Sequence, residues 1–442
     1  MGLCLFWREN LRLVFCRLSR RTSRVDARWL MRDVDDVEHA SASKSESDVE
    51  HAELGEWKGL ERFKDKVLLS CASWRSGCEV PMWLDCDPGH DDAFAMYAAA
   101  KGELCGDGCA PLATCRLMGV STVTGNQTIQ KTTTNAARVL EWLELGTDLF
   151  MGASKPLLRE SKVCEEIHGE SGLDTRNAID ALPHVSADEV IRRTLVGTPP
   201  AFAMYQAWKT LYHLKHRLVI VATGPLTNVA TFCLAFDDII CADTRGESFT
   251  KGPKIIFMGG AIGEGNTGSR AEFNIQCDPE AAKIVLESSF EVIMVPLEVT
   301  HTALVTEDVL CRLEEAATKG EDRKRVGNIR ELLNFFKMTY KQVFGFENPP
   351  LHDPCAVFCA MTEHFDAIRS GPQFQDAFTG RMERVDVECQ SDLTYGQTVI
   401  DCWGTSTKPK NVKVMTKMNV EKFWKFMCDS IRAHTDFCES KK

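Results

Sequence analysis

The sequence has no apolar run long enough to cross a lipid bilayer. A membrane-spanning helix needs roughly 20 mainly apolar residues, and no such run occurs in the 442 residues. The sequence also has no basic excess, since 63 acidic residues outnumber 52 lysines and arginines and give a formal net charge of −11. Binding to nucleic-acid phosphates requires clustered positive charge. We therefore expect no transmembrane segment and no nucleic-acid partner, but a cytoplasmic protein with a small-molecule substrate.

Cysteine is abundant, yet the C-x₂-C spacing of many zinc sites is absent. The 19 cysteines are odd in number and many lie in apolar stretches, which is typical of free buried thiols in a reducing compartment. The tightest group is Cys105, Cys109 and Cys115. Because paired spacing is missing, a zinc site is disfavoured there, and we interpret this segment as a surface loop.

The first 32 residues contain no lysine and almost no acidic residues, but many arginines. This composition is typical of organelle-targeting peptides, although an untargeted disordered extension explains it equally. An acidic, serine-containing stretch follows over 33–56 and favours a solvated linker. We expect a poorly ordered extension over 1–78 and one folded domain over 79–442.

Within that domain, short β-branched apolar runs alternate with longer helical stretches. The predicted strands are 80–87, 115–125, 217–224, 254–260 and 291–300, and the predicted helices include 91–102, 128–146, 225–236 and 278–289. Such alternation is typical of α/β proteins. The sequence predicts an open, mostly parallel central sheet flanked by helices, in a Rossmann-like arrangement.

Polar residues gather where the predicted strands end. They are Asp85 and Asp87, Thr124 to Asn126, Thr223 and Gly224, Met258 to Gly260, and Thr300 with His301. In open α/β sheets, ligands bind beyond the carboxyl ends of the strands. We expect the site at this edge.

The densest polar group is the stretch 85–92, which contains four aspartates. An EF-hand loop fails, because His90 and Met96 stand where that loop needs glycine and glutamate. A haloacid-dehalogenase-like phosphatase remains an alternative, since Asp85 and Asp87 form a strand-terminal Asp-x-Asp pair. A calcium site between Asp87 and Asp92 is the third interpretation. Capping of the following helix explains one or two of these acids, but not four.

Eight segments, in order along the chain, carry a family resemblance. They are "DCDPGHDDAFA", "GVSTVTGNQTIQKTTTNAARVL", "IHGESGLD", "VATGPLTNVA", "IIFMGGAIGEGNTGSRAEFNIQCDPEAA", "PLEVTHTALVT", "LHDPCAVF" and "VDVECQSDLTYGQTVID". Together they resemble the inosine-uridine-preferring nucleoside hydrolase family. Extra length around 103–114 and 241–252 is interpreted as loop insertions.

The resemblance implies a set of site residues. It implies a Ca²⁺ ion held by Asp87, Asp92, Asp353 and the Thr223 carbonyl, with Asp87 also as general base. It places the ribose against Asp91, Asn126, Asn266, Glu272 and Asn274, with Met258 and Phe273 beside them. On the base side it implies His352 as the acid that protonates the leaving base and His168 as a second contact.

The implied activity is hydrolysis of the N-glycosidic bond of ribonucleosides to ribose and free base, in purine or pyrimidine salvage or catabolism. The resemblance also implies that this chain forms a homodimer or homotetramer. Besides the phosphatase, the remaining alternative is a homologue that binds ribose and Ca²⁺ without turnover.

Overall fold

The structure is a computed structural model, and it describes residues 59–71, 74, 79–105, 111–176, 181–195, 197–245, 252–317, 323–368 and 376–440. Within these ranges no helix is both long enough and apolar enough to span a membrane.

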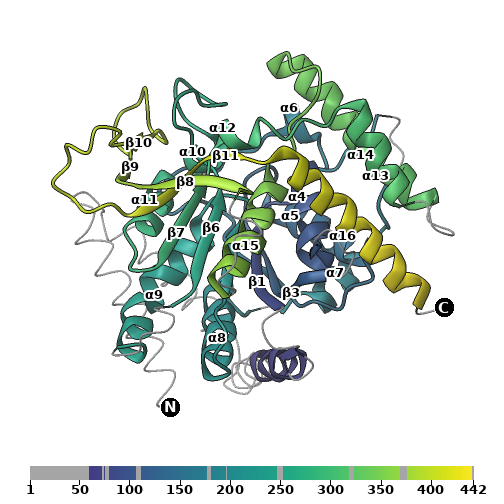
Figure 1. Cartoon of the computed structure of the whole chain (residues 1–442), viewed down its shortest axis with the longest axis horizontal. Helices are drawn as coiled ribbons and strands as arrows, with labels where there is room; N and C mark the ends of the chain where they lie inside the picture. Colours follow the sequence, from purple (N-terminus) through teal and green to yellow (C-terminus); the bar gives the residue numbers. More distant parts are fainter. Residues whose placement is uncertain are drawn as a thin grey trace, which may run out of the picture.

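A nine-stranded sheet forms the centre of the described chain (Figure 1). Its strands are β1 (Glu79–Cys86), β2 (Glu103–Cys105), β3 (Pro111–Thr122), β4 (Leu149–Met151), β5 (Val219–Ala222), β6 (Lys254–Met258), β7 (Glu291–Val295), β8 (Phe378–Glu383) and β11 (Val412–Met418). Their order is β2-β3-β1-β5-β6-β7-β11-β8, with β4 beside β3. The pairs from β3 to β11 are parallel, as is β3 with β4, whereas β2 and β8 pair antiparallel at the two edges. The predicted mostly parallel α/β sheet is confirmed.

Helices cover both faces of this sheet. They are α4 (His90–Lys101), α5 (Ile129–Trp142), α6 (Glu165–His168), α7 (Ala187–Arg193), α8 (Pro200–His213), α9 (Thr227–Asp243), α10 (Phe273–Cys277), α11 (Pro279–Leu286), α12 (Leu297–Thr300), α13 (Glu307–Ala316), α14 (Arg323–Phe344), α15 (Asp353–Ile368) and α16 (Val420–Ser440). A separate two-stranded ribbon is formed by β9 (Val385–Val387) and β10 (Thr398–Ile400).

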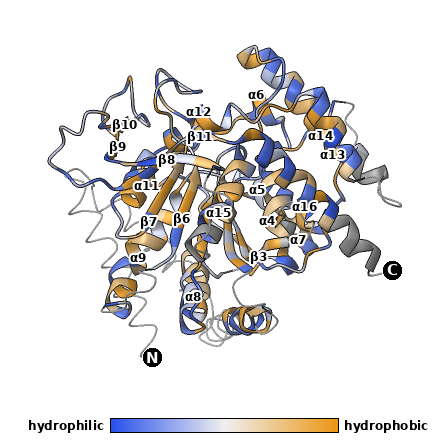
Figure 2. Cartoon of the chain, in the orientation of Figure 1, coloured by the Kyte–Doolittle hydropathy of each residue, from blue (hydrophilic) through white to orange (hydrophobic). Residues whose placement is uncertain are grey.

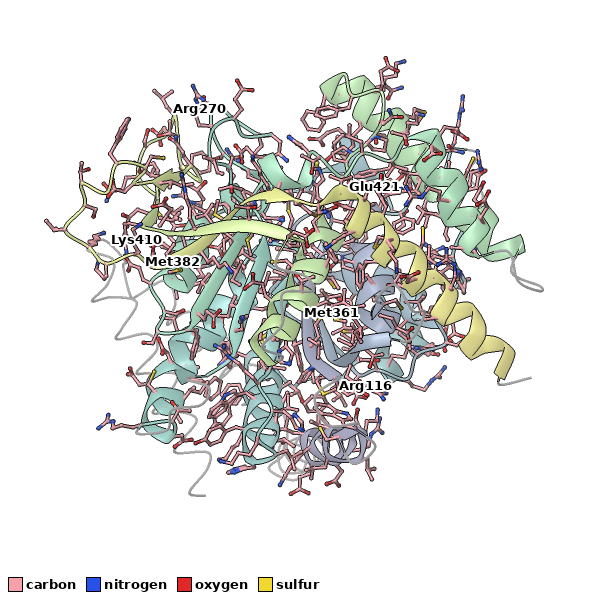
Figure 3. All side chains as sticks on the ribbon, viewed as in Figure 1. Arg116, Arg270, Met361, Met382, Lys410 and Glu421 are labelled. Carbon is pink, nitrogen blue, oxygen red and sulfur yellow. The ribbon has the colours of Figure 1, made fainter. Side chains whose placement is uncertain are left out.

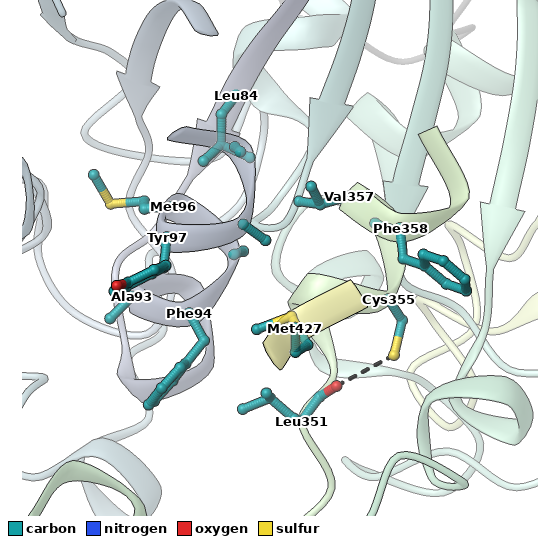
Figure 4. Packing of buried hydrophobic residues seen from close by; sticks show 14 of the residues in the cluster. Leu84, Ala93, Phe94, Met96, Tyr97, Leu351, Cys355, Val357, Phe358 and Met427 are labelled. Atoms are coloured by element: carbon teal, nitrogen blue, oxygen red, sulfur yellow. Dashed lines mark hydrogen bonds between the residues drawn. The ribbon is translucent and has the colours of Figure 1, made fainter. Parts of the chain in front are cut away.

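Alternating side chains of the central strands pack in two separate cores. In β1, Met82 and Leu84 join the core under α4, α15 and α16, whereas Trp83 joins the core under α8, α9 and α11. The period of two follows from strand geometry, and burial on both faces explains why the central strands are mainly apolar, as Figure 2 shows for β6 and β7. Leu84 lies between α4 and α15 in the first core (Figure 4). In Figure 3, Met361 lies deep inside the molecule while Arg270 projects outward.

Two local predictions are wrong. The strand predicted over 291–300 ends at Val295, and Leu297–Thr300 forms helix α12. Pro296 lies between them and has no N–H to continue a sheet ladder. The cysteine segment is not only a surface loop: Glu103–Cys105 pairs with the start of β3, and Cys115 is buried in β3. Cys109 lies outside the described residues.

A helix over 59–71 packs beneath the sheet, inside the stretch that we expected to be an extension. Phe63 and Val67 are buried, and the Phe63 ring meets Trp83 and Phe150 edge to face at 5.9 and 5.3 Å between centroids. The Lys66 ammonium lies 2.5 Å from the Asp148 carboxylate. The folded domain therefore begins before residue 79, while 1–58 lie outside the described residues.

Phe63→Ala should lower the free energy of unfolding by about 3 kcal/mol, because it removes a buried aromatic ring. Leu69→Ala is the matched control, since Leu69 on the same helix is 72% exposed, and it should cost less than about 0.5 kcal/mol. Urea unfolding measures both. Equal small effects would show that this helix contributes nothing to the fold.

Candidate active site

A pocket of about 260 Å³ lies at the carboxyl ends of the central strands. The predicted site residues that line it are Asp91, Asn126, His168, Thr223, Met258, Asn266, Glu272, Phe273, Asn274, His352 and Asp353. The other two, Asp87 and Asp92, are completely buried behind this wall. The structure thus brings together residues that are separated by up to 266 positions in the sequence.

The turn between β1 and α4 places Asp92 where it meets several donors. Its carboxylate accepts hydrogen bonds from the backbone N–H groups of Asp87 (3.3 Å) and Gly89 (3.0 Å). It also accepts from the Thr223 hydroxyl at 2.8 Å and the Asn126 amide at 3.0 Å. Capping at the start of α4 therefore accounts for part of the role of Asp92, as the sequence suggested for one or two of the four aspartates.

Asp91, Asp92 and Asp353 form a tight buried trio. Their carboxylate oxygens lie within 4.8 Å of one another, a spacing that could hold a metal ion. Burial raises the pKa of all three carboxyls, and repulsion from the neighbouring carboxylates adds to the rise for Asp91 and Asp353. A cation among them would relieve this cost. The trio therefore fits an ion that prefers oxygen ligands.

Asp87 adjoins this trio, and its carboxylate packs against Gly125 and Gly224. Its Oδ2 accepts the Asn126 N–H at 2.7 Å, whereas its buried Oδ1 has no hydrogen-bond partner among the described residues. A Cβ at Gly125 would lie 2.1 Å from Oδ2, and one at Gly224 would lie 2.6 Å from Oδ1. A buried carboxylate oxygen without a donor is costly, and a cation would satisfy it. The geometry thus supports a metal near Asp87, although the tightest trio contains Asp91 in its place.

Asp85, the first acid of the cluster, belongs to a different network. Its Oδ1 accepts from the Asn228 amide at 2.8 Å and from the Ser121 hydroxyl. Burial raises its pKa to about 7. Asp85 does not line the pocket, so the four aspartates divide into a structural residue and a group of three near the site.

The residues on the predicted ribose side are held by the loop before α10. The Glu272 carboxylate caps α10 by accepting the Asn274 N–H at 2.9 Å, and burial raises its pKa to about 7. The Asn274 amide donates to the Thr223 carbonyl at 2.8 Å. Asn266 accepts the Phe273 N–H at 2.9 Å. These bonds fix amide and carboxylate groups around the pocket without a ligand.

His352 lies between two hydroxyl groups. Its Nδ1 is 2.7 Å from the Thr300 hydroxyl, and its Nε2 is 2.8 Å from the Tyr340 hydroxyl. Burial and the nearby His301 hold its pKa well below the usual range, so the imidazole is neutral near pH 7. Tyr340 also lines the pocket. Sequence reasoning missed it, since a tyrosine on an apolar helix face carries no signal of chemistry.

His168 is also buried. Burial and two neighbouring histidines lower its pKa, so its imidazole is neutral. It contacts His90, which the sequence left without a role. Lys162, Cys164 and Gln276 line the same pocket and were likewise not anticipated. No motif in the sequence distinguishes them from ordinary loop residues.

Most of the chain matches a known protein family. Residues 82–425 match the family described as inosine-uridine preferring nucleoside hydrolase, and the chain belongs to this family of enzymes. The resemblance identified from the sequence is thereby confirmed, and the phosphatase alternative loses its support.

Two relatives show the extent of the similarity. A probable ribonucleoside hydrolase from Dictyostelium discoideum is 37% identical over 359 residues, which covers 80% of this chain and 94% of the relative. The pyrimidine-specific ribonucleoside hydrolase RihA from Shewanella oneidensis is 36% identical over 360 residues, with 80% and 97% covered.

Among solved structures, the purine-preferring ribonucleoside hydrolase from Gardnerella vaginalis superposes with a TM-score of 0.63. It is 23% identical, and the match covers 81% of this chain and 99% of that one. At this identity the likeness establishes the fold.

Asp92→Asn should abolish divalent-cation binding, measured by titration calorimetry, because it removes a charge from the trio. Asp85→Asn is the matched control: its amide nitrogen can replace Oδ2, which has no partner among the described residues, while Oδ1 keeps its donors. This variant should bind the cation with affinity within about threefold of the wild type. If both variants bound equally well, the ion would not lie at the trio.

Proposed function

We propose that this chain hydrolyses the N-glycosidic bond of ribonucleosides to ribose and a free nucleobase. The observation that carries the proposal is the convergence of Asp91, Asp92 and Asp353 at a pocket walled by amide, carboxylate and imidazole side chains. Cleavage of a glycosidic bond develops positive charge on the sugar, which carboxylates stabilise. The names of the relatives that are 36–37% identical support the same reaction.

Ca²⁺ is the proposed ion, with Asp87, Asp92, Asp353 and the Thr223 carbonyl as ligands. All are hard oxygen donors, and the unpartnered Oδ1 of Asp87 supports this set. When bound, Ca²⁺ supplies positive charge that lowers the pKa of water and attracts the ribose hydroxyls.

The side chains around the pocket have separate roles in the proposed reaction. Asp87 also accepts the proton of the attacking water. Asp91, Asn126, Asn266, Glu272 and Asn274 orient the ribose, with Met258 and Phe273 packed beside it.

On the base side, His352 acts through Tyr340 to protonate the departing base. The His352 ring is neutral, and its Nε2 lies 2.8 Å from the Tyr340 hydroxyl. The tyrosine O–H therefore donates the proton to the departing base, and the Nε2–H of the neutral imidazole stabilises the resulting phenolate by a hydrogen bond. Water then returns the proton to the tyrosine. His168 contacts the base from another side.

The purified protein should contain about one Ca²⁺ per chain by elemental analysis, and chelation should remove activity, because the buried carboxylates need a cation.

Asp87→Asn should lower kcat by more than the roughly 10²–10⁴ of a lost general base, since it removes a ligand as well. Asp85→Asn should retain most activity. Zinc in an active sample, or an Asp87→Asn enzyme with a tenth of normal turnover, would contradict these assignments.

His352→Ala and Tyr340→Phe should each slow inosine cleavage by roughly 10²–10⁴, the contribution of a general acid. Both should cleave a nitrophenyl riboside almost normally, because its phenolate leaves as a stable anion. Steady-state kinetics on the two substrates measure the difference. Equal losses on both would mean that His352 only supports the neighbouring Asp353.

The proposal extends to nucleoside salvage or catabolism in the cytoplasm, by a homodimer or homotetramer. Incubation with uridine, cytidine, inosine and a nucleotide tests the substrate class by the ribose released. A protein that binds ribose and Ca²⁺ but releases no base would be the silent homologue instead.

A further inference from the structure

The start of helix α4 is capped by a histidine from another loop. The N-cap is Gly89, which has no side chain to offer, and the first N–H groups of a helix find no partner within it. The His90 N–H donates to Nδ1 of His168 at 3.2 Å. A Cβ at position 89 would lie 2.4 Å from that Nδ1, so glycine is required for the close approach.

This contact determines which ring nitrogen of His168 carries the proton. A backbone nitrogen always keeps its hydrogen, so Nδ1 must offer a lone pair, and the neutral ring then carries its proton on Nε2. His168 lines the pocket, and Nε2 has no hydrogen-bond partner in the part of the chain that the structure describes. The pocket wall therefore contains a fixed N–H donor.

The His90 side chain holds the loop that carries this donor. Its Nε2 lies 2.8 Å from the Asp174 carbonyl, which can only accept, so Nε2 is protonated. The His90 ring stacks with Phe335 of α14, at 5.1 Å between centroids, and with His168, at 5.6 Å. The two Nδ1 atoms, 3.3 Å apart, then both offer lone pairs. Stacking and the bond to Asp174 therefore hold the rings together.

We propose that His90 is a positioning residue that clamps loop 168–174 against α4 and keeps His168 as an obligate hydrogen-bond donor to the nucleobase. The inference rests on the proposed nucleoside hydrolase function. The donor selects bases that present a carbonyl oxygen or an unprotonated ring nitrogen. A leaving group that needs no hydrogen bond gains nothing from it.

Three variants test this role by kinetics on uridine, inosine and a nitrophenyl riboside. His90→Phe keeps the stacking and loses the bond to Asp174, so kcat/KM should fall about tenfold on the nucleosides, as for one lost positioned hydrogen bond, and little on the nitrophenyl riboside. His90→Gln places an amide Nε2–H where the imidazole had one and should recover activity to within about threefold. His213→Phe, on the exposed side of α8, controls for the exchange itself. Equal losses on all substrates, or no rescue by glutamine, would overturn the proposal.

A second measurement does not depend on turnover. Nitrogen-15 NMR of the full-length protein should show His168 with an unprotonated Nδ1 and a protonated Nε2. The opposite tautomer would overturn the inference. A wild-type protein that cleaves neither nucleosides nor the riboside would reject the proposed function, while the NMR result would still decide whether His168 is held as a donor.

Discussion

Negative charge buried at the carboxyl ends of the strands is the constraint on which the rest of the structure depends. Asp87, Asp91, Asp92 and Asp353 are all buried, and no lysine or arginine within the described ranges forms an ion pair with any of them. Removing such charges from water costs several kcal/mol for each ion, even after relaxation. A fold that retains this cluster must compensate it, and a cation bound beside the pocket would do so.

The packing of two helices brings this charge together. Helices α4 and α15 both begin at the site, with aspartates in their first turns, where the helix dipole favours negative charge. Behind the site the two helices pack through apolar side chains, including Phe94 of α4 and Val357 of α15 (Figure 4). The apolar core thus fixes the separation of carboxylates that would otherwise repel one another. The same two helices therefore contribute both the packed core and the aspartates of the site.

Much of this arrangement could be predicted from the sequence. Apolar runs of the right length gave five strands of the sheet, and the polar residues that follow them mark the pocket edge because parallel strands end on the same side. The family segments then identified Asn266, Asn274 and Asp353, which local pattern alone could not connect. Their spacing in the sequence says nothing of their distance in space, so only resemblance could join them.

The remaining features depend on tertiary contacts that leave no local signal. Tyr340 and Phe335 lie on one amphipathic helix, and nothing in its pattern shows that it approaches two histidines. His90 looks like an ordinary first-turn residue until the loop carrying His168 is placed beside it. The helix over 59–71 was missed because the composition before it suggested disorder, whereas its apolar residues Phe63 and Val67 pack in the same core as Trp83.

The central claim is that a cation compensates the buried carboxylates, and thermal unfolding against free Ca²⁺ concentration tests it most directly. Each tenfold rise in free Ca²⁺ above its dissociation constant should add about 1.4 kcal/mol to the free energy of unfolding, so the melting temperature of the chelated protein should climb steadily as Ca²⁺ is restored. A melting temperature that does not change with Ca²⁺ or any other divalent cation would contradict the account.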